Sequence, residues 1–131
     1  MKTITYTTNK EFKKTKTYNS TNFYYYKDGN SCNIYIMVDF NIGEYDDGKK
    51  FLLENVYVTL NNEYSEVEEK LINNKKWYSI SVSDDYETSY YYIYVNRERT
   101  YYIKYSIEIN NKDDFCIKEK DRFINSLNVK E

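Results

Sequence analysis

The sequence predicts an α+β domain in which an antiparallel sheet of about six strands, ending in a C-terminal meander, packs against one mid-chain helix and one C-terminal helix. Tyrosine supplies 18 of the 131 residues and stands mostly at alternate positions, the spacing that lines one face of a strand. Two segments instead repeat apolar residues every three or four positions, as amphipathic helices do. The length suits a single domain over residues 1–131.

The first third of the chain predicts strands separated by polar connections. Residues 4–6 alternate and predict a short strand, whereas the lysine-rich segment 9–17 predicts a solvated loop in which Phe12 turns inward. The alternating runs 23–26 and 32–38 flank an Asp-Gly pair, and glycine reaches positive φ without steric cost. This arrangement predicts a β-hairpin.

The middle of the chain changes from strand spacing to helix spacing and back. Residues 47–61 predict a helix because an Asp stands at its start and apolar side chains recur every four residues, although the strand formers at 56–59 weaken the pattern. The recurring side chains are Leu52, Val56 and Leu60. Residues 64–72 suit either a helix or a strand, and we expect a hairpin that joins them to the alternating residues 77–83.

The last third of the chain predicts the meander and a closing helix. Residues 88–109 alternate on either side of a charged turn, and residues 114–127 repeat apolar side chains at helical spacing. With residues 77–83 the two alternating stretches form three strands that have one apolar and one amphipathic side. We expect both helices to cover the apolar side and to seal one interior.

Composition argues against most enzymatic chemistry. Because the chain has no histidine, Ser-His-Asp and Cys-His nucleophilic schemes and the usual mixed zinc sites are excluded, and three isolated glycines form no phosphate-binding loop. Helix caps and turns explain the acidic clusters at 39–47 and 84–87. A net charge of -2 gives no positive field to attract nucleic acid. We therefore expect a non-enzymatic protein with no metal, no cofactor, no nucleic-acid partner and no transmembrane segment.

Three segments follow one another in an order that is known from a protein family. They are residues 73–79 with their Trp-Tyr pair, the tyrosine-rich residues 101–105, and residues 123–127 at the end of the closing helix. This order resembles the PsbP-like fold over residues 31–129, and more narrowly the small secreted or lipid-anchored domains of low-GC Gram-positive bacteria. The resemblance implies a sheet sandwiched by helices, an extracytoplasmic address, and a binding or accessory role without assigned catalytic residues.

The two cysteines, Cys32 and Cys116, bear on the compartment. In an exported domain, as the resemblance implies, they would be oxidised to a disulfide. The alternative is two separate buried thiols in a cytosolic protein. The sequence starts at Met1 without an apolar leader, so we expect a secreted or lipid-anchored protein if a leader was removed, and a cytoplasmic one otherwise.

Aromatic side chains of the meander are the candidate binding residues. Trp77, Tyr90, Tyr92 and Tyr94 offer an exposed platform for a protein or cell-surface partner, because Tyr and Trp give large, rigid contact areas with a polar edge. The alternative is that they form a second core layer beneath a helix or fill cross-strand pairs.

The leading hypothesis is therefore a non-enzymatic extracytoplasmic binding or accessory domain that uses this aromatic sheet face. The alternative is a small intracellular viral or mobile-element protein that acts by surface mimicry on a host protein. Residue usage typical of an AT-rich genome and the start at Met1 suit that alternative.

Overall fold

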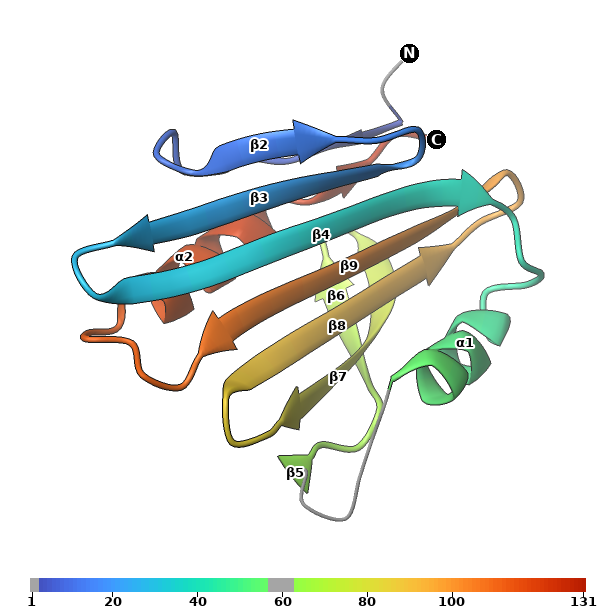
Figure 1. Ribbon diagram of the computed structural model, residues 1–131. Helices are drawn as coiled ribbons and strands as arrows, with labels where there is room; N and C mark the ends of the chain where they lie inside the picture. Colours follow the sequence, from blue (N-terminus) through green and yellow to red (C-terminus); the bar gives the residue numbers. More distant parts are fainter. Residues whose placement is uncertain (1–2, 57–62) are drawn as a thin grey trace.

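The computed structural model describes residues 3–56 and 63–131, which form a main antiparallel sheet of eight strands, two helices and a separate two-stranded ribbon (Figure 1). The predicted α+β class is confirmed, with eight strands in the main sheet where about six were expected. The strands are β1 Ile4–Thr5, β2 Lys13–Lys16, β3 Ser20–Lys27, β4 Asn30–Phe40, β5 Glu63–Tyr64, β6 Glu68–Ile72, β7 Lys75–Ser83, β8 Glu87–Val95, β9 Arg99–Glu108 and β10 Asn128–Val129, and the helices are α1 Asp47–Asn55 and α2 Phe115–Asn125.

The main sheet joins the N-terminal hairpin to the C-terminal meander. Its strand order is β2-β3-β4-β9-β8-β7-β5, and β6 also pairs with β7. All of these pairs are antiparallel, as predicted. The long strands β4 and β9 meet at the centre, where Ile34 lies opposite Tyr105 and Ile36 lies opposite Ile103. The predicted meander β7-β8-β9 and both predicted hairpins are present.

Both hairpins close through two residues with positive φ. Asp28 and Gly29 (φ 54° and 79°) connect β3 to β4, and Asn73 and Asn74 (φ 46° and 67°) connect β6 to β7. Glycine has no Cβ to clash in this region, and Asn and Asp tolerate it better than other residues. Turns of this kind match the twist of the flanking strands, so the turn residues help to set the register of each hairpin.

The lysine-rich segment 9–17 corrects one prediction. It was expected to be a loop, but Lys13–Lys16 form β2 at the edge of the sheet, with all four side chains exposed. Phe12 turns inward as predicted and is 8% exposed. Lysines on an edge strand keep its unpaired backbone groups from pairing with another sheet, which explains why a strand carries this composition.

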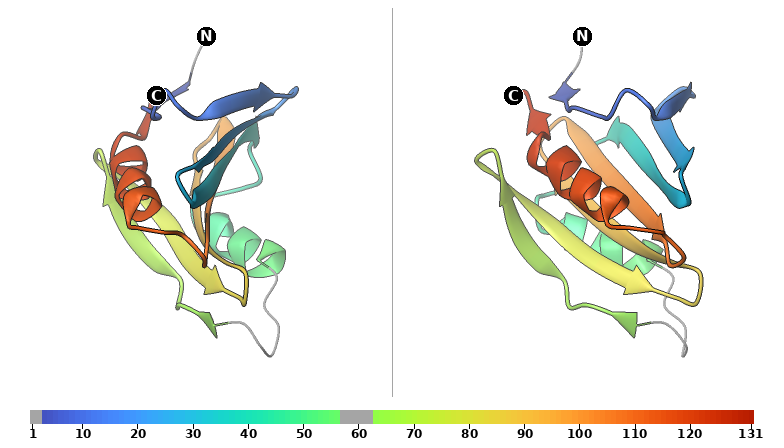
Figure 2. Two further views of the ribbon diagram at one scale, coloured as in Figure 1. Left: turned by 60° about the vertical axis from the view of Figure 1, so that its left-hand side comes forward. Right: turned by 90° about the vertical axis from the view of Figure 1, so that its left-hand side faces the viewer.

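The two helices lie on opposite faces of the sheet, so the expectation that both cover one side is wrong. Helix α1 packs against β7 and β8, and α2 packs against β4 and β9 on the other face (Figure 2). Helix α2 lies within the predicted range 114–127. Helix α1 begins at the predicted residue but ends at Asn55, and Val56 is already extended. Residues 57–61 of the predicted helix lie outside the described residues.

Each face of the sheet therefore has a core of its own. Alternation makes this possible, because successive side chains of β8 and β9 point to opposite faces and both sets are apolar or aromatic. Gly48 lets α1 approach the sheet closely, since a Cβ there would lie 3.3 Å from Ile93 Cγ2. The fully buried side chains toward α2 include Ile34, Trp77, Tyr101, Ile103, Tyr105, Cys116, Phe123, Ile124 and Leu127, and those toward α1 include Leu52 and Ile93.

The two ends of the chain meet in a small ribbon beside α2 (Figure 1). In this ribbon Ile4 of β1, a predicted strand, pairs with Val129 of β10, which was not predicted. The Lys130 N–H also donates to the Thr3 carbonyl at 2.7 Å. The ribbon adds Ile4 and Val129 to the core on the α2 side.

Candidate functional site

The aromatic residues predicted to form an exposed platform do not form one. Trp77 is 1% exposed and Tyr92 is 4% exposed, while Tyr90 and Tyr94 are half-buried. All four lie on the α2 side of the sheet with its core. The structure therefore agrees with the alternative interpretation, in which these residues form a second core layer. The prediction of an exposed platform is wrong.

Charged side chains of the C-terminal segment cover the edge of this layer. The Lys120 ammonium of α2 lies 4.0 Å from the centre of the Tyr90 ring, a cation–π contact. The Tyr94 hydroxyl donates to Glu131 Oε1 at 2.6 Å, and the same carboxylate oxygen lies 2.8 Å from Lys75 Nζ. These two hydrogen bonds lower the pKa of Glu131, the one from Lys75 having the larger effect.

An aromatic surface that is open to solvent lies on the opposite face of the sheet. Helix α1 covers β7 and β8 but leaves β3 and β4 uncovered (Figure 1). Here the side chains alternate with the buried ones of the same strands, so they point away from α2. We call this surface the open tyrosine face: Asn22, Tyr24 and Tyr26 of β3, Asn33, Tyr35 and Met37 of β4, and Tyr102 and Lys104 of β9.

The strand register places these side chains in rows across the sheet. Asn22 pairs with Tyr35 and Tyr35 with Lys104, while Tyr24 pairs with Asn33. Neighbouring rows touch, because the rings of Tyr35 and Tyr102 lie 6.1 Å apart in an edge-to-face arrangement. Cross-strand contacts of this kind stabilise the sheet by roughly 0.2–1 kcal/mol each.

Helix α1 forms the border of the open tyrosine face. The Phe51 ring of α1 meets the Tyr102 ring edge-on at 5.6 Å, so Tyr102 is half-buried. Beyond this contact the side chains become more exposed, reaching 49% for Tyr24 and 85% for Tyr26. Burial raises the pKa of the Tyr102 hydroxyl above its ordinary value, because the charged phenolate is poorly solvated beside Phe51.

The charge on the open tyrosine face is small and mostly positive. Lys104 holds its ammonium 5.5 Å from the centre of the Tyr91 ring, and Lys13 pairs with Tyr24 from the edge strand β2. Asp39 lies at the far end of β4, where its carboxylate accepts hydrogen bonds from the Asn19 side chain and the Phe40 N–H. The open tyrosine face thus combines flat aromatic area with phenol and amide groups.

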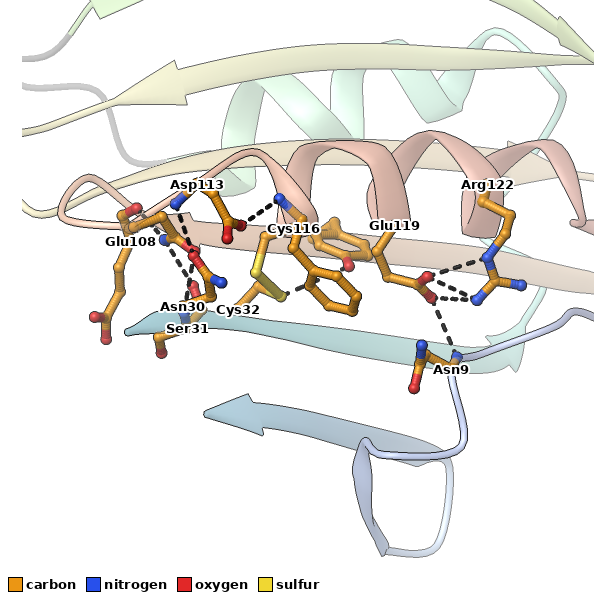
Figure 3. The surroundings of a disulfide bond; sticks show 12 residues. Asn9, Asn30, Ser31, Cys32, Glu108, Asp113, Cys116, Glu119 and Arg122 are labelled. Atoms are coloured by element: carbon orange, nitrogen blue, oxygen red, sulfur yellow. Dashed lines mark hydrogen bonds and ion pairs between the residues drawn. A yellow bond between two sulfur atoms is a disulfide. The ribbon is translucent and has the colours of Figure 1, made fainter. Parts of the chain in front are cut away.

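The predicted cysteine pair forms a disulfide between β4 and the first turn of α2 (Figure 3). Cys32 and Cys116 are both buried, their Cα atoms are 6.1 Å apart, and 84 positions separate them in the sequence. The link therefore joins α2 to the sheet between segments that are distant in the chain.

Neither described helix, of nine and eleven residues, is long and apolar enough to cross a membrane.

An ion pair between a buried glutamate and an exposed arginine lies one turn further along α2 (Figure 3). Glu119 is 4% exposed, and its carboxylate accepts three hydrogen bonds from the Arg122 guanidinium, the shortest at 2.6 Å. It also accepts from the Asn9 backbone N–H at 3.1 Å, so it fastens the segment after β1 to the helix. Among residues 3–56 and 63–131, no group of three or more His, Cys, Asp and Glu side chains is placed to hold a metal ion.

Comparison with known proteins identifies the fold alone. No protein-family model and no curated protein matches the sequence. A crystal structure of a protein from Bacteroides thetaiotaomicron VPI-5482 has a similar fold, with a TM-score of 0.51 and 11% sequence identity. The similarity covers 98% of this chain and 46% of that one, so this chain spans about half the length of its neighbour. Membership of the PsbP-like family remains a prediction.

The sequence carried a signal for the open tyrosine face that the predictions did not use. The alternating run 32–38 places Ile34 and Ile36 on one face of the strand, and therefore Tyr35 and Met37 on the other. No periodicity distinguishes an uncovered tyrosine row from a buried one, because Tyr90 and Tyr92 alternate in the same way. Only the position of α1 on the sheet shows which tyrosines remain open.

Proposed function

We propose that this chain is a non-enzymatic binding or accessory domain that works outside the cytoplasm and contacts a protein partner through the open tyrosine face. The observation that carries the proposal is the exposure of Tyr24 and Tyr26 on β3, beside the half-buried Tyr35 of β4, on the part of the sheet that α1 leaves uncovered. Tyrosine is enriched at the energetic centres of protein interfaces, because it gives a large contact area with a polar edge and loses little side-chain entropy.

The disulfide supports an extracytoplasmic address. Disulfides form and persist in oxidising compartments, whereas glutathione and thioredoxin keep most cytosolic thiols reduced. The bond between Cys32 and Cys116 thus favours the proposed address over an intracellular mimic of a host protein. The resemblance to secreted or lipid-anchored PsbP-like domains suggests the same address.

The open tyrosine face is tested by crosslinking in the cells that produce the protein. A photoreactive benzoyl-phenylalanine replaces Tyr24, and the control carries it at Tyr86, which is 81% exposed in the β7–β8 turn. We expect discrete protein adducts from position 24 that Tyr35→Ser reduces at least tenfold, and none from position 86. Equal adducts from both positions, or none from position 24, would contradict the binding role. Circular dichroism checks that Tyr35→Ser remains folded.

The address is tested separately by alkylating intact cells before lysis. A protein that works outside the cytoplasm carries no alkyl label on its cysteines when it is recovered under denaturing, non-reducing conditions. Label on both cysteines would contradict the proposed address without deciding whether the open tyrosine face binds.

A further inference from the structure

A groove of about 710 Å³ lies on the α2 side of the sheet, away from the open tyrosine face. It runs between the segment that contains β1 and strands β2, β3 and β4. The volume is within the range of small-molecule sites, which occupy roughly 300–1,000 Å³. The lining residues that matter for binding are Lys14, Lys16, Phe23, Ile36, Val38 and Arg99.

The groove has an apolar floor. Phe23 and Ile36 belong to the core and are 6% and 4% exposed, and Val38 packs beside them on β4. The Tyr6 ring lies edge-on to Phe23, with ring centres 5.9 Å apart, and forms part of the wall on the β1 side. An apolar chain laid on this floor would remove its remaining surface from water, which stabilises the bound state.

The charged side chains that line the groove are all cationic. Lys14 and Lys16 project from β2 on the same side as Phe23, and the Lys14 ammonium lies 5.9 Å from the centre of the Phe23 ring. Arg99 enters from the start of β9. Among the described lining residues there is no Asp or Glu. Asp39, which accepts from the lining residue Asn19, is not part of the lining.

Arg99 also has an unsatisfied donor. Its Nε atom is buried and has no hydrogen-bond partner among the described residues. A buried N–H without an acceptor costs free energy, and a bound anion would recover it, because hydrogen bonds between charged groups are stronger than neutral ones. Arginine presents its N–H groups as a planar fork that matches a carboxylate.

We propose that this groove binds a free small amphiphile that has a carboxylate head and an apolar chain. The carboxylate lies near Arg99 and Lys16, and the chain lies on Val38, Ile36 and Phe23 toward Lys14. The groove faces away from the open tyrosine face, so this binding and the proposed protein contact are independent.

Calorimetry with three ligands tests the proposal. Dodecanoate is compared with dodecanol, which has the same chain without the charge, and with acetate, which has the head without the chain, all below micelle-forming concentrations. We expect dodecanoate to bind at least tenfold more tightly than either of the others, and its affinity to fall as salt is added, since screening weakens the ionic contacts. Equal binding of dodecanol and dodecanoate would overturn the proposal. Phosphatidylglycerol vesicles are titrated separately, and binding to these vesicles without binding to free dodecanoate would also overturn it.

Matched variants locate the site. Arg99→Gln and the double variant Lys14→Gln/Lys16→Gln should each weaken dodecanoate binding about tenfold or more. The control Lys49→Gln/Lys50→Gln removes the same charge from α1 on the other face and should leave the affinity unchanged. The exposed lysine pair tests the proposal even where Arg99→Gln unfolds the domain. Equal losses in the two double variants would show a general charge effect and would overturn the assignment to the groove.

Discussion

The sheet face toward α2 and the face toward α1 bury similar mixtures of tyrosine and isoleucine, yet they are held in different ways. On the α2 side, the Cys32–Cys116 disulfide, the buried Glu119 carboxylate and the β1–β10 ribbon link distant parts of the chain. On the α1 side, a nine-residue helix is held by apolar packing and by a hydrogen bond from the Tyr78 hydroxyl to Asp46 at 2.6 Å. The α2 side is thus covered and cross-linked by covalent and ionic contacts. The α1 side is covered only in part, by a short helix.

The difference in coverage follows from simple dimensions. A helix with its side chains is about 10 Å wide and adjacent strands lie about 4.8 Å apart, so one helix covers about two strands. Helix α1 therefore covers β7 and β8, and Tyr24 and Tyr26 of β3 stay exposed. On the other face the two chain ends add to the cover that α2 provides. A sheet of eight strands with one short helix on a face must leave some of that face open or have it covered by a partner.

Loss of the disulfide is expected to have the largest effect on the comparison. Cys32→Ala/Cys116→Ala frees a loop of about 85 residues, which lowers the free energy of unfolding by about 4 kcal/mol in the chain-entropy description. Urea denaturation of the variant and of the parent protein measures the difference. A loss below about 1 kcal/mol would show that the α2 side does not depend on its covalent link. A reducing agent added to both samples should lower the free energy of unfolding of the parent protein and leave that of the cysteine-free variant unchanged.

Truncation of Leu52 tests the α1 side. This side chain is 0% exposed beneath α1, and its removal leaves a cavity, so Leu52→Ala should destabilise the protein by about 3 kcal/mol. Hydrogen exchange should then accelerate in α1 more than in α2. The neighbouring Leu53 is 57% exposed, and Leu53→Ala is the matched control with an expected change below about 0.5 kcal/mol. Equal acceleration in both helices would mean that the two faces unfold as one unit.

The buried carboxylate provides a smaller test. Glu119→Gln keeps the shape of the side chain but removes the charge that pairs with Arg122 and accepts from Asn9, so we expect a loss of about 2 kcal/mol. Glu54→Gln is the control, because its contact with Lys50 is 3.9 Å long and exposed on α1. Thermal unfolding followed by circular dichroism compares the two. Similar small losses for both variants would show that Glu119 contributes no more than a surface pair.

Two tyrosine hydroxyls beneath α1 provide the smallest and most specific test. Tyr78→Phe removes a hydrogen bond to Asp46 and should cost about 1 kcal/mol. Tyr45 stacks on Tyr78 at 4.8 Å, but its buried hydroxyl has no partner among the described residues. Tyr45→Phe should therefore leave stability unchanged or raise it slightly. A larger loss for Tyr45→Phe than for Tyr78→Phe in urea denaturation would contradict this assignment.

Alkaline pH sharpens the same comparison. Burial, with smaller contributions from Glu69 and Asp46, raises the pKa of Tyr45 to about 12 from 10.0. The folded protein thus holds this proton more tightly than the unfolded chain does, so the contribution of Tyr45 is complete below pH 10 and is lost as the pH rises toward 12. Tyr45→Phe should make stability fall less steeply over this interval. An unchanged slope would contradict the raised pKa.

Much of the fold was predictable because its signals are local. Alternation in 88–95 and 101–109 predicted β8 and β9, the Asp-Gly pair predicted the first hairpin, and the alternation of 77–83 predicted the second. Strands β2 and β10 were not predicted. Each is too short to show an alternating pattern of its own, and the structure shows them as strands through their pairing with β3 and β1. The disulfide was one of two alternatives at the sequence level, and the approach of α2 to β4 decided between them.

The exposed aromatic residues were harder to predict than the strands. Trp77 and Tyr92 were expected on a solvent-exposed platform and instead lie in the core, whereas Tyr24 and Tyr26 are exposed. Tyrosine suits both environments, because its ring favours burial and its hydroxyl favours water or a polar partner. Composition and spacing therefore cannot distinguish a buried tyrosine from an exposed one.

By itself the sequence determined which residues share a strand face, where the tight turns fall and that the chain folds as α+β, because side-chain periodicity and turn chemistry depend on near neighbours. The tertiary structure alone decided that the helices take opposite faces, that Cys32 meets Cys116, and which tyrosines stay open. Both faces of the central strands are apolar enough to be buried, so the choice depends on contacts between segments far apart in the chain. Those contacts leave no periodic signal in the sequence.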